Sequence, residues 1–211
     1  MAQLQTLPRR LDYLVVCGET GSAKSKLLEL LAASGSQVLD LEQLASHRGS
    51  VLGDVPGEPQ PPQKLFDSVL WSQLRRLDPA RPVFVEAESR KIGQLQLPVA
   101  LLERMREGRC IAIRAPIAER VKFLITEYGH FLDDPQALKS RLGYLTDLYG
   151  HDLINRWLAL VDERAWEELV RDLLVNHYDP AYKRSTLRNY PDLDNARVLN
   201  LERLSAAGLD T

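Results

Sequence analysis

The chain has 211 residues, of which 45% are hydrophobic and 27% charged, values that are typical of a soluble globular domain and exclude a disordered protein. Its 27 basic and 29 acidic side chains leave a net charge of −2, which excludes nucleic-acid binding through bulk positive charge alone. The two cysteines, Cys17 and Cys110, lie in separate apolar runs, which excludes a disulfide framework and a cysteine zinc site. No segment approaches about eighteen consecutive apolar residues, and the N-terminus lacks a signal-peptide pattern. We therefore expect a cytoplasmic protein without a membrane segment.

The first half of the chain alternates between strand-like and helix-like segments. A short apolar run at 11–17 ends at a glycine, which predicts a buried strand. The stretch at 42–62 is rich in Gly and Pro, and it is longer than most loops that only connect two elements. Loops of this length in compact domains are usually functional or disordered. The other expected elements are a helix at 24–33, a strand at 37–41, a helix at 63–77, a strand at 82–85, a helix at 98–107 and a strand at 109–113. This alternation predicts a parallel sheet covered by helices on both faces.

The second half of the chain is helical almost throughout. Helical spacing of apolar residues predicts helices near 118–128, 135–149, 151–160 and 163–176, and a last strand at 196–200 returns to the sheet. The sequence thus predicts an α/β core at 1–115, an all-helical insert at 116–190, and a return strand with a short C-terminal helix at 191–211.

A phosphate-binding motif follows the first expected strand. It comprises Gly18, Glu19, Thr20, Gly21, Ser22, Ala23, Lys24 and Ser25, and it fits the pattern G-x-x-x-x-G-K-[ST] except at Ala23. In this pattern backbone N–H groups turn inward around an anion at a helix N-terminus, the lysine adds a cation, and the hydroxyl reaches Mg²⁺. With the strand and helix order, the motif predicts a P-loop NTPase-like fold of the kinase type, with about five strands and a helical insert. The alternative is an ordinary connection between a strand and a helix.

Ala23 stands where the pattern has its second glycine. If the backbone there needs a positive φ, the Cβ costs about 1 kcal/mol, which a loop can tolerate. If the ligand needs the space that the Ala23 Cβ occupies, the ligand specificity of the loop changes. Ala23 therefore weakens the inference to nucleotide hydrolysis more than the inference to phosphate binding. Cys17 borders the loop, and we expect it to be a buried strand residue rather than a nucleophile.

Two further segments contain groups suited to an anion or a metal. His47, Arg48, Gly49 and Ser50 follow the second expected strand, where loops of an open α/β sheet approach the phosphate loop. The third expected strand ends in Glu86-Ala87-Glu88-Ser89-Arg90. An acidic residue at this position commonly supports Mg²⁺ in phosphate-loop proteins, which makes Glu86 or Glu88 a metal ligand or a base. The alternatives are a solvated loop for the first segment and a structural ion pair for the second.

An aromatic and basic stripe lies near the end of the helical region. It comprises Tyr178, Tyr182, Lys183, Arg184 and Arg188. Aromatic faces beside cations suit an unstacked base and its backbone, so these residues are candidates for RNA contact, although such stripes also occur on plain helices. We expect Trp157 and Trp166 to belong to the core of the insert.

Taken together, these motifs resemble one family, the C-terminal phosphate-loop domain of tRNA 2-selenouridine synthase, also described as a tRNA 2-thiouridine geranyltransferase. The resemblance covers most of residues 11–185. It is carried by residues 18–25, 39–42, 44–50, 60–63 with Phe66, 85–93 with Pro98, and 178–180 with Tyr182. The segments at 47–50 and 88–93 are much more specific than the phosphate loop.

The resemblance implies a two-step change of the wobble 2-thiouridine of certain tRNAs. Geranyl diphosphate first alkylates the sulfur, and selenium from selenophosphate then displaces the geranylthio group. The family's rhodanese-like domain, which carries a cysteine for the selenium step, has no counterpart in this sequence, so we expect that step to need a separate rhodanese-like chain. Ala23 also departs from the family's usual loop.

The resulting hypothesis is a transferase in which Lys24, Arg48 and Arg90 neutralise the diphosphate. Ser25 and Glu86 would position Mg²⁺, and Glu88 or His47 would orient the substrate. The rivals are a small-molecule kinase or NTPase of the same fold, and a module that binds tRNA or a nucleotide and catalyses nothing.

Overall fold

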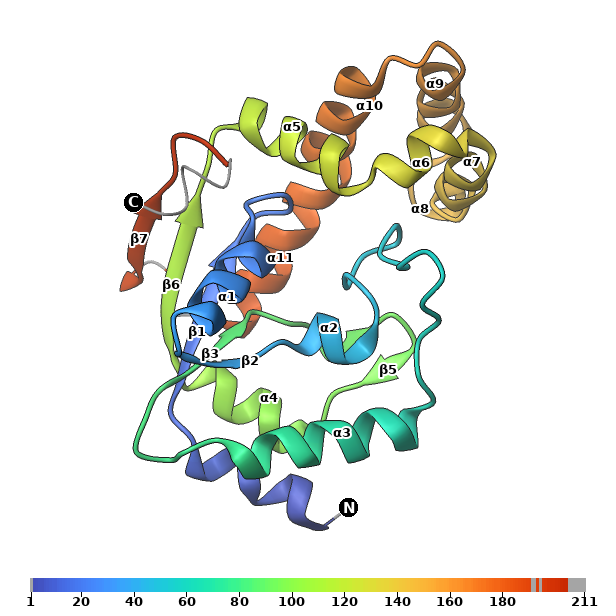
Figure 1. Ribbon diagram of the computed structural model, residues 1–211. Helices are drawn as coiled ribbons and strands as arrows, with labels where there is room; N and C mark the ends of the chain where they lie inside the picture. The colour runs from blue at the N-terminus through green and yellow to red at the C-terminus, as the bar shows by residue number, and fades with distance from the viewer. Residues whose placement is uncertain (1, 191–192, 194, 205–211) are drawn as a thin grey trace.

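The computed structural model describes residues 2–190, 193 and 195–204. At its centre lies a five-stranded sheet with the strand order β2-β3-β1-β6-β7 (Figure 1). All neighbouring strands are parallel, and β1 pairs through Val15 with Val85 of β3 and with Cys110 of β6. The strands are β1 (Tyr13–Gly18), β2 (Gln37–Leu39), β3 (Val83–Glu86), β6 (Arg109–Arg114) and β7 (Arg197–Asn200). The predicted α/β core with a parallel sheet of about five strands is confirmed.

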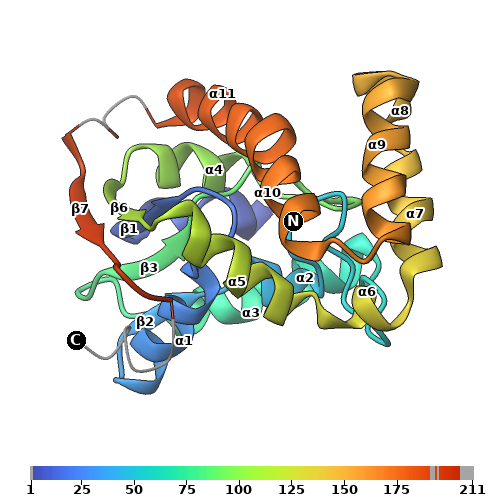
Figure 2. The same ribbon diagram turned by 90° about the horizontal axis from the view of Figure 1, so that it is seen from above.

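Helices cover both faces of the sheet, as predicted. Alternate residues of β1 point to opposite faces, so Val15 packs in one apolar cluster and Val16 in another. The first cluster contains side chains of α3 (Gln63–Arg76) and α4 (Val99–Arg106), and the second contains Leu28 of α1 (Lys24–Ala33). Figure 2 shows α4 and α11 (Asp179–Asn189) on one side of β1 and α1 on the other. Two 3₁₀ turns, Ala2–Gln5 and Leu7–Arg10, precede the sheet.

The second expected strand ends two residues early. The Asp40 side chain accepts a hydrogen bond from Gln43 N at 2.8 Å and so caps a short helix, α2 (Leu41–Ala45). The sequence analysis missed this helix, although Asp at an N-cap position is a common signal of a helix start. The short helix turns the chain immediately after β2, so that residue 42 faces the end of the sheet rather than continuing along it.

A small hairpin fixes the long loop to the core. Its strands are β4 (Lys91–Ile92) and β5 (Leu95–Gln96), which pair antiparallel. Gln60 Nε2 donates to Ala45 O and to Ile92 O, and Gln60 Oε1 accepts from Gln94 N. Gln63 likewise exchanges two hydrogen bonds with the backbone of Gln96. The Gln60-Pro61-Pro62-Gln63 segment, for which the sequence indicated only rigidity, therefore joins the loop to the hairpin.

The helical region projects from the sheet (Figure 1). It comprises α5 (Ile117–Glu127), α6 (Gly129–Asp133), α7 (Pro135–Gly143), α8 (Thr146–Tyr149), α9 (His151–Asp162) and α10 (Trp166–Leu173). A π-helical turn, Leu174–Tyr178, joins α10 to α11. These helices share their own apolar cluster, in which Trp157 is fully buried and Trp166 is partly buried, as expected.

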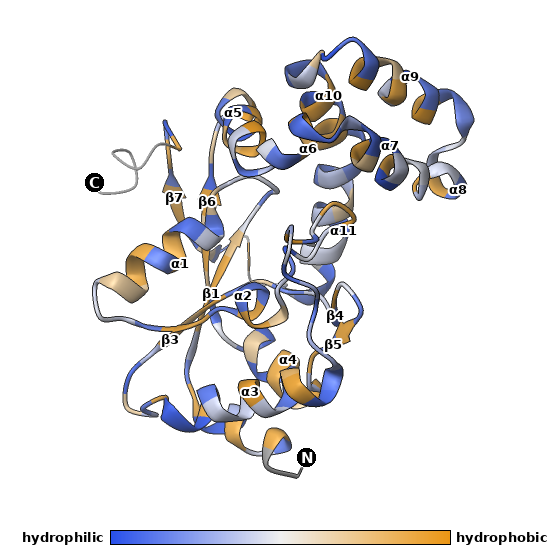
Figure 3. Cartoon of the chain, turned by 45° about the vertical axis from the view of Figure 1, so that its right-hand side comes forward, coloured by the Kyte–Doolittle hydropathy of each residue, from blue (hydrophilic) through white to orange (hydrophobic). Residues whose placement is uncertain are grey.

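Two features of this region differ from the expected helices. The helix expected at 135–149 is divided into α7 and α8. The expected helices ended at residue 176, whereas the structure has a further helix, α11, which follows the π-turn and leads back to the sheet core through buried Tyr190. Figure 3 shows apolar residues concentrated on the strands and on α4. The expected C-terminal helix falls largely on residues 205–211, outside the described part of the chain. Within the described part, no helix has the length and apolar character needed to cross a membrane.

Candidate functional site

The phosphate loop lies at the carboxyl end of β1 and borders a cavity of about 450 Å³. Residues 20–25 line one wall of this cavity, and Glu42, Arg48 and Glu86 lie on others. Lys24 is the first residue of α1, and its Nζ donates to Gly18 O at 2.9 Å and to Glu19 O at 3.4 Å. The lysine ammonium is thus held across the loop, at a helix N-terminus where the backbone already favours an anion.

Ala23 has the left-handed backbone that the motif's missing glycine would have supplied. Its φ is 62° and its ψ is 32°, while its side chain is 2% exposed and packs with Val16 and Leu28. The loop therefore keeps its backbone shape despite the Cβ, at a conformational cost of about 1–2 kcal/mol. The methyl group is accommodated among apolar side chains, at the point where the loop also borders the cavity.

Three carboxylates converge beside the loop. Glu86 ends β3, Glu88 follows it, and Glu42 lies in α2, and one oxygen from each lies within 4.8 Å of the others. Ser25 Oγ donates to Glu42 Oε2 at 3.3 Å. Glu86 is 1% exposed, and within the described part of the chain its Oε1 has no hydrogen-bond partner. A buried carboxylate oxygen without a partner requires a proton or a cation.

The pKa values of this acidic cluster are raised. Burial raises the pKa of Glu42 to about 7 and that of Glu88 to about 8, and it raises the pKa of Glu86 well above its usual range. The neighbouring carboxylates raise these values further, whereas Lys24 opposes the rise. The three carboxylates together with the Ser25 hydroxyl form a set of oxygen ligands of the kind that Mg²⁺ prefers. The residues present therefore fit a divalent cation.

Glu42 had no assigned role in the sequence analysis. Its only signal in the sequence is its place in the segment 39–42, which contributes to the family resemblance. Its role depends on β2 lying beside β3, because that pairing brings the residues that follow both strands to one edge of the sheet. An acidic residue shortly after each of two neighbouring strands is the signal that could have found it.

The segment at 47–50 closes over the acidic cluster. Gly49 has φ +68°, and a Cβ added there would lie 3.1 Å from Glu42 Oε1 and 3.6 Å from both oxygens of Glu88. Any other residue would be strained and would crowd the carboxylates. His47 is 6% exposed, and its Nδ1 accepts from Gly49 N at 3.0 Å, so it holds the turn. His47 and Arg48 both line the cavity.

Arg48 and Arg90, the two arginines predicted to face the diphosphate, are placed differently. Arg48 lines the cavity, donates to Glu127 O at 2.8 Å and lies over the Tyr128 ring at 4.7 Å. Arg90 is exposed and does not line the cavity, because the chain turns away there into the β4–β5 hairpin. The structure thus brings Arg48 to the site but not Arg90.

A buried arginine that the sequence analysis missed supports the loop from α5. Arg120 is 1% exposed, and it forms an ion pair with Glu19 of the loop and another with Asp179 of α11. Its NH2 donates to Asp179 Oδ1 at 2.9 Å and to Oδ2 at 2.8 Å. Arginine at a single helix position has no distinguishing sequence signal, so only the fold reveals this contact.

The candidate tRNA residues divide into two groups. Tyr182 Oη accepts a hydrogen bond from Gly18 N at 2.6 Å, so Tyr182 is part of the loop's support. Tyr178 lies in the π-turn and faces a second, apolar cavity. Lys183, Arg184 and Arg188 are exposed on α11, where they remain candidates for contact with an RNA backbone.

Several tRNA 2-selenouridine synthases share sequence with much of this chain. One tRNA 2-selenouridine synthase, from Nitrosomonas europaea, is 38% identical over 118 residues, 54% of this chain and 30% of that protein. A second, from Alcanivorax borkumensis, is 31% identical over 80% of this chain and 53% of the relative. A third, from Aeromonas salmonicida, is 37% identical over 81% of this chain and 52% of the relative. The chain thus spans about half the length of the longer-matching relatives.

Two solved structures align with most of the chain at low similarity. TT1252 from Thermus thermophilus aligns over 94% of this chain and 92% of its own, with a TM-score of 0.39 and 18% identity. A gluconokinase from Sinorhizobium meliloti 1021 aligns over 96% and 93%, with a TM-score of 0.35 and 13% identity. Residues 11–143 match the family described as tRNA 2-selenouridine synthase AAA domain. With its phosphate loop and adjoining acidic cluster, the chain belongs to that family.

Proposed function

We propose that this chain is the phosphate-loop part of a transferase that modifies the wobble uridine of tRNA, and that its reaction is the transfer of a geranyl group from geranyl diphosphate to 2-thiouridine. The observation that carries the proposal is the single cavity in which Lys24, Ser25 and the carboxylates of Glu42 and Glu86 meet. The family assignment supports tRNA modification, and the cavity suits a diphosphate leaving group.

The chemistry requires negative charge to be stabilised as it develops. The sulfur at C2 of the base attacks C1 of the geranyl group with a lone pair, and a carbon–sulfur bond forms. The C1–oxygen bond breaks, its electron pair leaves with the diphosphate, and the base loses its N3 proton to solvent. The loop N–H groups and Lys24 stabilise the departing diphosphate, which is the part of the reaction where preorganised charge has the largest effect. No nucleotide hydrolysis is needed.

Mg²⁺ would be held by Ser25, Glu42 and Glu86, with Glu88 adjoining. When bound, the ion supplies charge neutralisation for the diphosphate oxygens. The chain's own contribution is to hold the three carboxylates together beside Gly49 and to place Arg48 in the same cavity as Glu42 and Glu86. The exposed cations of α11 would contact the tRNA backbone.

Cys17, which borders the phosphate loop, is not suited to the selenium step. Cys17 is fully buried in β1, and a hydrogen bond with Cys110 together with burial raises the pKa of its thiol. A thiol that stays protonated and inaccessible does not act as a nucleophile. The replacement of the geranylthio group by selenium from selenophosphate is therefore proposed to need a cysteine from a separate rhodanese-like unit.

The test is transfer of a geranyl group to 2-thiouridine tRNA, detected as a mass gain on the modified nucleoside. The Lys24→Ala variant should lose transfer by about 10²- to 10³-fold, whereas Lys64→Ala, which removes an exposed lysine of α3 outside the cavity, should not. In parallel, the shift in melting temperature of the protein is measured with geranyl diphosphate, ATP and GTP, to show which of these ligands it binds. Full activity of Lys24→Ala would refute the role of the loop. Stabilisation and turnover of ATP without modified tRNA would indicate a kinase, and tRNA binding without product would indicate a non-catalytic module.

A further inference from the structure

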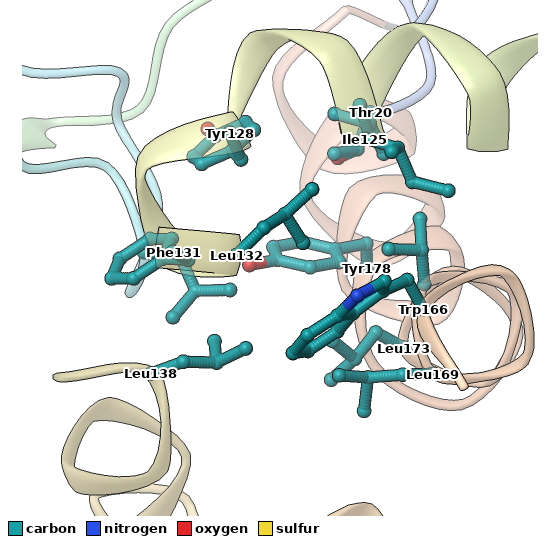
Figure 4. Close-up of a pocket in the computed structure, with 13 residues that line it drawn as sticks. Thr20, Ile125, Tyr128, Phe131, Leu132, Leu138, Trp166, Leu169, Leu173 and Tyr178 are labelled. Atoms are coloured by element: carbon teal, nitrogen blue, oxygen red, sulfur yellow. The ribbon is translucent and has the colours of Figure 1, made fainter. Parts of the chain in front are cut away.

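A second cavity lies in the helical region and has an apolar lining. Its volume is about 60 Å³, and none of its thirteen lining residues carries a charge. Figure 4 shows Phe131, Leu138, Trp166, Leu169 and Tyr178 around this space, which we call the apolar cavity. The side chains come from α6, α7, α10 and the π-turn, so the cavity is formed by helices that meet only in the tertiary structure.

The apolar cavity and the phosphate cavity have a common wall. Thr20, Leu124 and Tyr128 line both of them. The contact between loop and helix is close, because a Cβ added at Gly21, which has φ +78°, would lie 2.8 Å from Leu124 Cγ. Gly21 therefore allows the phosphate loop to pack directly against a side chain of the apolar cavity. An anion held by the loop would lie beside an apolar space.

From this juxtaposition we infer that the apolar cavity binds the acyclic hydrocarbon tail of the ligand whose phosphate head lies in the phosphate loop. The inference rests on the proposed function and adds to it where the tail is held. A ligand with an anionic head and an apolar chain satisfies both cavities at once. A nucleoside would place ribose hydroxyls and base edges among Leu, Phe and Val side chains, and those polar groups would lose their hydrogen bonds with water.

The size of the apolar cavity indicates how much of the tail it holds. A water-sized group needs about 10–15 Å³ on this measure of volume, so 60 Å³ accommodates about four to six such groups. That is roughly one five-carbon isoprene unit. The distal unit of a two-unit chain would occupy the apolar cavity, and the proximal unit would pass Thr20, Leu124 and Tyr128 toward the loop.

The π-turn contributes to this arrangement. It comprises Leu174–Tyr178, between α10 and α11, and turns of this kind are rare and occur frequently at functional sites. Tyr178, its last residue, faces the cavity, while Asp179, which follows, pairs with Arg120 beneath the phosphate loop. The turn thus connects the wall of the apolar cavity to the support of the phosphate loop.

Isothermal titration calorimetry in the presence of Mg²⁺ tests the inference by comparing geranyl diphosphate with pyrophosphate. Each buried methylene increases affinity about fourfold, so wild-type protein should bind geranyl diphosphate about a hundredfold or more tighter than pyrophosphate. Leu132→Trp and Val170→Trp fill the apolar cavity from α6 and α10, and each should remove most of that advantage while pyrophosphate affinity stays unchanged. Leu148→Trp, at an exposed position outside the cavity, is the matched control and should bind as wild type does. Circular dichroism verifies that each variant folds.

The outcomes separate this inference from the proposed function. If Lys24→Ala weakens binding of both ligands but the two cavity-filling variants bind geranyl diphosphate as wild type does, the phosphate site stands and the tail site is refuted. If wild-type protein binds neither ligand, the proposed function fails. The apolar cavity is then tested directly with geraniol, an uncharged alcohol, by the NMR signal of the Trp166 indole N–H. A shift that Leu132→Trp abolishes would support the cavity as a hydrocarbon site, and the absence of a shift would overturn it.

Discussion

Removal of the Arg120 guanidinium should destabilise the protein strongly. Arg120 is 2% exposed at its side chain, Asp179 is 25% exposed, and Glu19 is 51% exposed. Breaking a buried pair by removing one partner costs about 3–5 kcal/mol, whereas an exposed pair contributes about 0–1 kcal/mol. We therefore expect Arg120→Met to lower the free energy of unfolding by about 3–5 kcal/mol, with most of the loss arising from the uncompensated Asp179.

Urea unfolding followed by circular dichroism measures this effect, with Asp179→Asn, Glu19→Gln and the Arg120→Met/Asp179→Asn double variant alongside. Glu19→Gln should cost less than about 1 kcal/mol because its carboxylate is half exposed. The double variant should be more stable than the sum of the single losses predicts, with a coupling energy of at least about 1 kcal/mol. A loss below about 1 kcal/mol for Arg120→Met, or simple additivity in the double variant, would refute the view that this arginine joins α5 and α11 to the phosphate loop.

Two further predictions concern the loop and the segment beside it. Ala23→Gly should change the free energy of unfolding by no more than about 1 kcal/mol, because relief of the left-handed backbone is offset by a more flexible unfolded chain and a lost buried methyl group. In contrast, Ala23→Val should cost about 1–3 kcal/mol at this φ; urea unfolding checks both, and equal stability of the two variants would contradict the prediction. Burial lowers the pKa of His47 below its usual 6.5, so below pH 6.5 the unfolded chain binds a proton that the folded chain does not. Wild-type protein should therefore lose stability relative to His47→Gln as the pH falls from 7.5 to 5.5, by up to about 1.4 kcal/mol per pH unit, and a constant difference across that range would exclude the effect.

Local patterns account for what the amino-acid sequence determined by itself. The alternation of apolar β-forming runs with segments of helical spacing was sufficient to predict the parallel sheet and its covering helices, because the periodicity of apolar residues reflects which faces are buried. The motif at 18–25 was sufficient for the phosphate loop, because its backbone shape is built from consecutive residues. For Ala23 the sequence left two alternatives open, and the structure shows the one with a positive φ.

The tertiary structure alone decided which distant residues meet at the loop. Arg120 lies 101 residues from Glu19, and Tyr182 lies 164 residues from Gly18, yet each forms a direct hydrogen bond there. Glu42 joins Glu86 only because β2 lies beside β3, and Arg90 is excluded because a hairpin turns it away. The apolar cavity likewise depends on the tertiary structure, since the residues that line it come from separate helices. Periodicity shows that a residue is buried, but the residues against which it packs follow from the order of strands and the docking of helices, which depend on the whole chain.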